Sequence, residues 1–196
     1  MHNSIAAGES LLITLGIAPE QLKAIKSHWK RTHFRAVVNW LTKYQPPTEA
    51  SNLENLKGYL EAFNHLCQAE EWVKANQIRS LQYYSSPEDE GLSLSLRLGR
   101  WGYHQEKVVL YEKLLGKVDK VLDSIYRNEL GNAYYNLGQY SHAIEYHTKQ
   151  VKLAGSNSKL KGSALLGLGN VYFAIGNQTE SLKQNVTDVG RIKPLV

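Results

Sequence analysis

Apolar residues recur along this chain at intervals of three and four, the spacing that places them on one side of an α-helix. A helix start is predicted at Pro19 and Glu20, because proline suits the first helical position and an acid complements the helix dipole. One stripe that we expect to be buried follows: Leu22, Ile25, Trp29, Ala36 and Trp40. Pro46 and Pro47 end this helix, and the apolar residues 11–18 before it predict a short buried helix.

The same spacing continues through residues 51–118. Ser51 and Glu54 form a capping-box pattern that opens a helix. Its apolar ridge is Leu53, Leu56, Leu60, Phe63 and Cys67. The run EEWVKANQI from Glu70 predicts an antiparallel partner helix. A start signal at residues 86–89, SPED, then precedes an apolar run (Leu92, Leu96 and Leu98), a break at Gly102 and a helix over 108–115. No long alternation with a period of two occurs, so we predict an all-α chain built of helix pairs.

A block of fifteen residues occurs twice near the C-terminus. Residues 130–144 read LGNAYYNLGQYSHAI, and residues 168–182 read LGNVYFAIGNQTESL. Five identical residues recur at an offset of 38: Leu130, Gly131, Asn132, Tyr134 and Gly138. The second helices of four pairs align on a small or branched residue: Ala75, Val108, Ala143 and Ser181. A period in this range indicates stacked repeats.

These residues resemble the tetratricopeptide repeat (TPR). The family's series is carried by Leu130, Gly131, Tyr134, Gly138, Tyr140 and Ala143. The second copy departs from it at Gln178 and Ser181. The match is specific over residues 124–182 and suggestive over 53–118. The chain is similar in this respect to bacterial TPR-array proteins. The resemblance implies an all-α, right-handed superhelical α-solenoid of antiparallel helix pairs.

The chain then divides into four segments. Residues 1–47 form an N-terminal helical extension with a basic helix, and 48–118 form degenerate TPR-like pairs. Residues 119–186 hold two TPR repeats, and 187–196 form a frayed tail. In both repeats, glycine should admit a close partner helix, tyrosine should fill the space between pairs, and a second glycine should end the first helix with a positive φ. These residues are Gly131 and Gly169, Tyr134 and Tyr172, and Gly138 and Gly176.

The first helices of a TPR stack line its concave face, so the resemblance also implies a binding groove. The candidate partner-binding residues are Asn128, Asn132, Tyr135, Asn136, Asn170 and Phe173. An Asn amide both donates and accepts, and each such bond contributes about 1 kcal/mol net. The alternative is that Asn132 and Asn170 simply face water. We therefore predict a non-catalytic protein–protein interaction module or scaffold, whose protein or peptide partner is unidentified.

Charge suggests a second function. The formal net charge is +5 and the pI about 9.1, and residues 23–43 contain no acid. Their basic residues are interleaved with Trp29, Phe34 and Trp40: Lys23, Lys26, Lys30, Arg31, Arg35 and Lys43. Such a patch could contact nucleic acid or an acidic partner. The favoured interpretation is a solvated face on a helix whose aromatic residues are core, which makes nucleic acid the secondary hypothesis.

Other chemistry is poorly represented in the sequence. No nucleophile–base set or complete nucleotide-binding motif occurs, so no enzyme activity and no cofactor are predicted. Cys67 is the only cysteine and is expected in the core, and the histidine pairs are five residues apart, which does not suit a helical metal site. Residues 11–18 are too few to span a bilayer, and we expect a cytoplasmic protein. An open array end around Val171, Phe173 and Ile175 would favour self-association.

Overall fold

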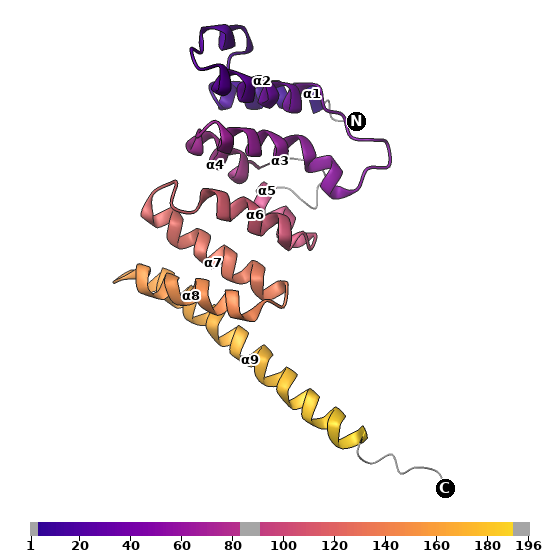
Figure 1. Ribbon diagram of the computed structural model, residues 1–196, viewed down its shortest axis with the longest axis vertical. Helices are drawn as coiled ribbons and strands as arrows, with labels where there is room; N and C mark the ends of the chain where they lie inside the picture. The colour runs from indigo at the N-terminus through magenta and orange to yellow at the C-terminus, as the bar shows by residue number, and fades with distance from the viewer. Residues whose placement is uncertain (1–3, 83–90, 190–196) are drawn as a thin grey trace. The chain divides into compact units, whose positions relative to one another are not determined.

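The computed structural model describes the backbone of residues 4–82 and 91–189, and the side chains of residues 8–82 and 91–177. Within these ranges every regular element is a helix (Figure 1), which confirms the all-α prediction. The β pairing found there is an isolated bridge between Gln82 and Ser93. The chain forms two compact units, Met1–Asp119 and Lys120–Val196.

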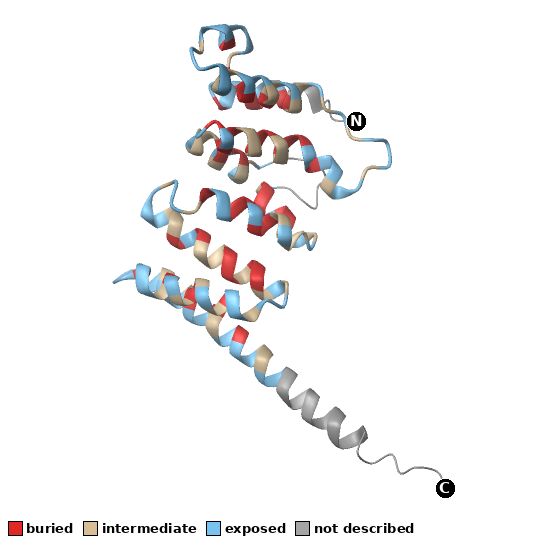
Figure 2. Cartoon of the chain, viewed as in Figure 1, coloured by how far each residue is buried: buried red, intermediate tan, exposed pale blue. Residues whose placement is uncertain are grey.

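The first unit consists of helices that pack in chain order. They are α1 (Ser4–Thr14), the 3₁₀ helix η1 (Pro19–Ala24), α2 (His28–Thr42), α3 (Asn52–Gln68), α4 (Trp72–Ser80), α5 (Leu94–Arg100) and α6 (His104–Leu114). Each of these α-helices packs on the next, and α4 also contacts α6. Buried residues alternate with exposed ones along these helices (Figure 2).

The helix predicted from Pro19 is divided in the structure. η1 ends at Ala24, and α2 begins after Ser27, whose Oγ accepts a hydrogen bond from the Lys30 backbone at 3.3 Å. The break changes which residues of α2 face the core, and Trp29 is exposed, so the predicted stripe is wrong at this residue. Ile25, Ala36 and Trp40 are half-buried, and α2 instead buries His33, Phe34, Val37 and Leu41.

The helix predicted over residues 11–18 lies earlier, at Ser4–Thr14, although four of its apolar residues are buried: Leu11, Leu12, Leu15 and Ile17.

α3 begins as the sequence predicts. Ser51 Oγ accepts from the Glu54 backbone at 3.3 Å, and Glu54 Oε2 accepts from the Ser51 backbone at 2.7 Å, which completes the capping box. Most of the ridge is buried, whereas Leu53 and Leu60 are half-buried. The predicted partner helix is present as α4 and packs on α3.

The start signal at 86–89 lies outside the described residues, and α5 begins after the Ser93 cap. Leu94 and Leu98 are buried, but Leu96 is exposed. Gly102 has a φ of 80° and separates α5 from α6, which confirms the predicted break.

The second unit contains α7 (Lys120–Asn136), α8 (Tyr140–Ala154) and α9 (Ser158–Val189), which all contact one another. The α7–α8 pair has the predicted details. Gly138 has a φ of 70°, and Ala143 is fully buried. Tyr134 is buried and stacks on the Tyr146 ring at 5.5 Å between centroids. Three of the four aligned small positions, Ala75, Val108 and Ala143, are buried, and the Ser181 side chain lies outside the described ones.

The predicted fourth helix pair is absent from the described backbone. Gly176 lies inside α9 without a positive φ, so the chain does not reverse there. Tyr172 is exposed, and a Cβ placed on Gly169 would meet nothing within 4 Å. The tail predicted to fray from residue 187 remains helical to Val189, and residues 190–196 lie outside the described part. Within that part, no helix is long and apolar enough to cross a bilayer.

Candidate interaction surfaces

The predicted partner-binding residues all lie in the second unit, on α7 and α9. On α7, Asn128, Asn132 and Tyr135 are half-buried and Asn136 is exposed. Asn136 donates to the Asn132 backbone oxygen at 2.8 Å, and the Tyr135 ring lies 5.9 Å from that of Tyr140. The Oδ1 atom of Asn128 is buried and has no hydrogen-bond partner among the described atoms. Buried polar atoms are usually hydrogen-bonded, so this oxygen is an exception within the core side of α7 and is not open to a ligand.

On α9, Asn170 and Phe173 are both exposed. Because α7 and α9 pack on each other, the six predicted residues share one unit. We use the name α7–α9 face for these six residues as a set. The equivalence of Asn132 and Asn170 does not extend to burial, since Asn132 is half-buried and Asn170 is not.

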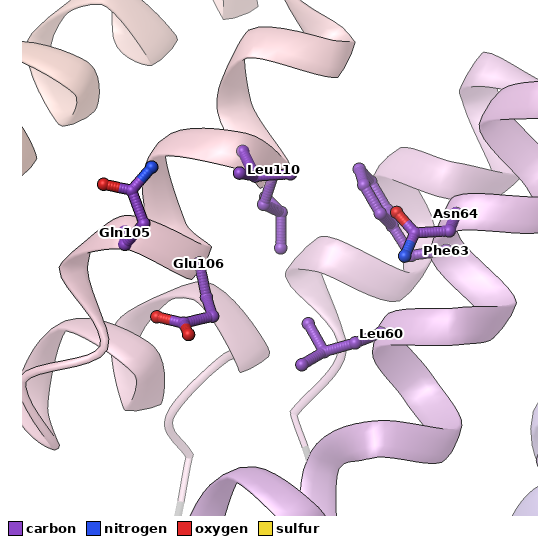
Figure 3. A pocket seen from close by; sticks show the side chains of 7 residues that line it. Leu60, Phe63, Asn64, Gln105, Glu106 and Leu110 are labelled. Atoms are coloured by element: carbon purple, nitrogen blue, oxygen red, sulfur yellow. The ribbon is translucent and has the colours of Figure 1, made fainter.

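A pocket that the sequence did not indicate lies in the first unit, between α3 and α6 (Figure 3). Its volume is about 170 Å³, and it is lined by Leu60, Phe63, Asn64, Gln105, Glu106, Val109 and Leu110. Figure 3 shows Leu60 and Leu110 pointing into the space between the two helices, with Asn64 at one side and Glu106 at the other. Small-molecule sites commonly have about 300–1,000 Å³. The α3–α6 pocket therefore has room for a side chain rather than for a cofactor.

The rim of this pocket is polar and partly acidic. Lys113 Nζ donates to Asn64 Oδ1 at 2.6 Å and connects α6 with α3. Glu106 is half-buried and makes no ion pair within the described residues. Leu60 was predicted to be part of a core ridge, but it is half-exposed. Whether such a residue is buried or lines a pocket depends on the position of α6, which the local spacing of apolar residues does not determine.

The basic residues of 23–43 do not form a uniform free patch. Lys30 forms an ion pair with Glu71 on the α3–α4 connection, and Lys74 Nζ lies 2.9 Å from the same carboxylate. Although burial favours the protonated form of Glu71, hydrogen bonds from these two lysines outweigh it and hold its pKa below the usual range. Arg31 Nη1 donates to the Ile25 backbone oxygen at 3.0 Å. Lys23, Lys26 and Arg35 remain exposed.

Two of the histidines that did not suit a metal site, His33 and His147, are packed in the core. His33 of α2 and His65 of α3 approach to 3.0 Å between their Nδ1 atoms, and desolvation with the neighbouring His65 lowers the pKa of His33. His147 of α8 is fully buried, and both ring nitrogens lack a hydrogen-bond partner of good geometry within the described part. A Cβ on Gly131 would lie 2.5 Å from its ring, and one on Gly167 would lie 2.3 Å from it.

The predicted close approach at Gly131 is thus confirmed, and the one at Gly169 is wrong because Gly167 takes that role. Cys67 is in the core as predicted, and burial raises the pKa of its thiol to about 11. Over the described residues, no group of three or more His, Cys, Asp and Glu side chains is arranged to hold a metal ion.

Comparison of the chain with protein-family models, with curated proteins and with solved structures gives no match. The class that the coordinates define is therefore an all-helical protein whose helices pack in sequential pairs.

Proposed function

We propose that this chain is a non-catalytic protein–protein interaction module that binds a peptide or a helix from its partner. The observation that carries the proposal is the α3–α6 pocket. An apolar floor of one-side-chain size with an amide and a carboxylate at its rim suits an anchor residue of a peptide. Because Glu106 makes no ion pair with the residues that the structure describes, we expect a Lys or Arg next to the apolar anchor.

We also propose that the helix pairs are TPR-like. Supporting this are the details of α7 and α8, in which Gly131 faces a buried ring, Ala143 is buried and Gly138 carries the positive φ. The α7–α9 face would then supply further contacts, with the exposed amides of Asn136 and Asn170 as hydrogen-bonding groups for a peptide backbone. Each neutral hydrogen bond of this kind is worth about 1 kcal/mol, so the α7–α9 face adds specificity more than affinity.

A filled pocket tests the proposal. Val109 lines the pocket and is 41% exposed, so Val109→Trp fills the site without entering the core. The matched control is Val73→Trp, at a position of α4 that is 73% exposed and outside the pocket. Peptide arrays identify ligands, and fluorescence polarisation gives their affinity. We expect Val109→Trp to weaken binding about tenfold or more, which corresponds to 1.4 kcal/mol, and the control to leave it unchanged.

Two results would contradict the proposal. One is peptide binding that neither Val109→Trp nor the pair Asn132→Ala and Asn170→Ala affects. The other is that nucleic acid, and no peptide, binds with an affinity that falls steeply with salt, as expected when lysines and arginines replace counterions. That second outcome would move the function to the exposed basic residues Lys23, Lys26 and Arg35.

A further inference from the structure

One side of α9 is apolar and uncovered in the described structure. At about 100° per residue, Ala164, Gly167 and Val171 share the side that is buried within the unit, so Val171 does not belong to the open array end that was predicted around it. Four large apolar residues lie on the opposite side and are at least half exposed: Leu165 (51%), Leu166 (67%), Tyr172 (58%) and Phe173 (70%). No charged residue occurs from 162 to 177. Contiguous apolar surface without charge marks an interaction site.

The order of residues on this side is symmetric about Gly169. Glycines stand seven positions before it and seven after it, at Gly162 and Gly176. A pair of large apolar residues stands three and four positions away in each direction: Leu165 and Leu166 before it, Tyr172 and Phe173 after it. A two-fold axis at Gly169 would set residues of like size against one another. An interface between identical copies must be self-complementary in this way.

We propose that a second copy of this chain covers this side of α9 in an antiparallel helix pair centred on Gly169. Leu165 of one copy packs near Phe173 of the other, and Leu166 packs near Tyr172. The glycines permit close approach of the two backbones, because a Cβ on Gly162, Gly169 or Gly176 would meet nothing within 4 Å in a single copy. We call the contact the α9 dimer.

The described residues that follow do not provide this cover. α9 continues through Gly176 to Val189, so residues 177–189 lead away from the face rather than back over it. The α7–α8 pair shows the contrast, since the chain reverses at Gly138 and α8 covers Tyr134. The α9 dimer goes beyond the proposed peptide-binding function and uses none of the residues that line the α3–α6 pocket. It does take Phe173 from the α7–α9 face.

The size of the contact indicates a weak association. Residues 162–176 span about 22 Å of helix, and a single helix pair of that length buries less than the roughly 800 Å² per partner of a standard interface. Sedimentation velocity over a wide concentration range is therefore the measurement. We expect the wild type to shift from monomer to dimer as its concentration rises.

Two variants separate the contact from folding. Gly169→Leu adds a good helix former at an open position, so it keeps the fold while blocking close approach, and Tyr172→Glu places a charge in the contact. Each should weaken dimerisation at least tenfold, with an unchanged circular dichroism spectrum. The matched control, Val73→Glu on α4, should dimerise like the wild type. A wild type that remains monomeric at every concentration overturns the proposal, as does a dimer that both α9 variants leave intact.

Cysteine crosslinking determines orientation, in a Cys67→Ala background. Gly169→Cys should form a disulfide-linked dimer under mild oxidation. Gly162→Cys and Gly176→Cys should not crosslink alone but should crosslink when mixed, because the two positions face each other in the antiparallel pair. Crosslinking of Gly162→Cys by itself would indicate a parallel pair and sink the proposal. Absence of any crosslink, with residue 169 protected from thiol reagents in a monomer, would show cover from within the same chain.

Discussion

His147 is held between two helices that each present a glycine to its ring. Gly131 belongs to α7 and Gly167 to α9, and added Cβ atoms would approach the same ring atoms, Cε1 and Nε2. The ring is fully buried, so it cannot move into solvent to avoid them. This side chain fixes how closely three helices approach, and any larger residue at either glycine must displace it.

We therefore predict opposite effects at glycines only two residues apart. Gly131→Ala and Gly167→Ala should each lower the free energy of unfolding by about 1–3 kcal/mol, the usual cost of overpacking a core. Gly169→Ala, in open space on the same helix as Gly167, should be neutral or should raise it by up to about 1 kcal/mol through helix propensity. Urea unfolding of the three variants is the measurement. Equal effects at Gly167 and Gly169 would mean that the ring does not limit helix approach.

The burial of His147 also leads us to predict that the second unit is less stable in acid. Desolvation lowers the pKa of His147, against a smaller opposing effect of Gln150. The unfolded chain binds the proton with an ordinary pKa of about 6.5, so it takes up protons more readily than the folded chain does. The folded state therefore keeps its full stability above about pH 6.5, where both states are neutral at this histidine. It loses stability as the pH falls through about 6.5 toward the lower pKa that His147 has in the folded chain.

Unfolding measured between about pH 5 and pH 8 should thus show a stability that falls below about pH 6.5, less steeply in His147→Gln. His33 and His104, whose pKa values are also lowered chiefly by desolvation, should leave a residual slope in that variant. Parallel pH profiles for the wild type and His147→Gln would exclude His147 as a source of the effect.

At the scale of elements, helix starts are locally encoded and helix ends are less so. Ser27, Ser51 and Ser93 each cap a helix, but of the three only Ser51 also donates its backbone N–H to the carboxylate of a Glu three residues later. Ser51→Ala should lower the free energy of unfolding by about 1 kcal/mol, and Ser27→Ala by less. Ser141→Ala is the control, because this exposed serine makes no side-chain hydrogen bond within the described residues. A larger loss at Ser27 than at Ser51 in urea unfolding would contradict the argument.

What the sequence predicted depends on whether the cause was local. The capping box at Ser51, the reversal at Gly138 and the buried position of Ala143 follow from residue type and spacing, and all are confirmed. Gly176 was predicted to end a helix by its equivalence to Gly138, yet a glycine only permits a reversal. The reversal also needs a following helix that packs back, and the described backbone of α9 continues instead.

The site was harder to predict for the same reason. Because Gly169 is equivalent to Gly131 in the repeat, the close approach of a neighbouring helix was predicted at Gly169. In the structure α8 approaches α9 closely at Gly167 instead, and the equivalent position of α7 does not have this role. The α3–α6 pocket arises from the spacing of two helices about forty residues apart in the chain. Its wall residues, Leu60 and Leu110, have the same apolar pattern as any core ridge. Periodicity identifies which residues are apolar, whereas tertiary packing decides which of them remain open to a partner.

At the scale of the whole molecule, each compact unit has a core of its own, and unfolding should reflect this. Leu66 of α3 and Leu130 of α7 are both fully buried, one in each unit. Replacing either with Ala should cost about 2–5 kcal/mol. If the units open separately, hydrogen exchange in Leu130→Ala should accelerate in α7, α8 and the first half of α9 while α3 and α4 keep their protection. Leu66→Ala should do the reverse. Acceleration in both units from either change would show that the chain unfolds as one cooperative body, and every stability difference measured at His147 or Ser51 would then report on the entire chain rather than on its own unit.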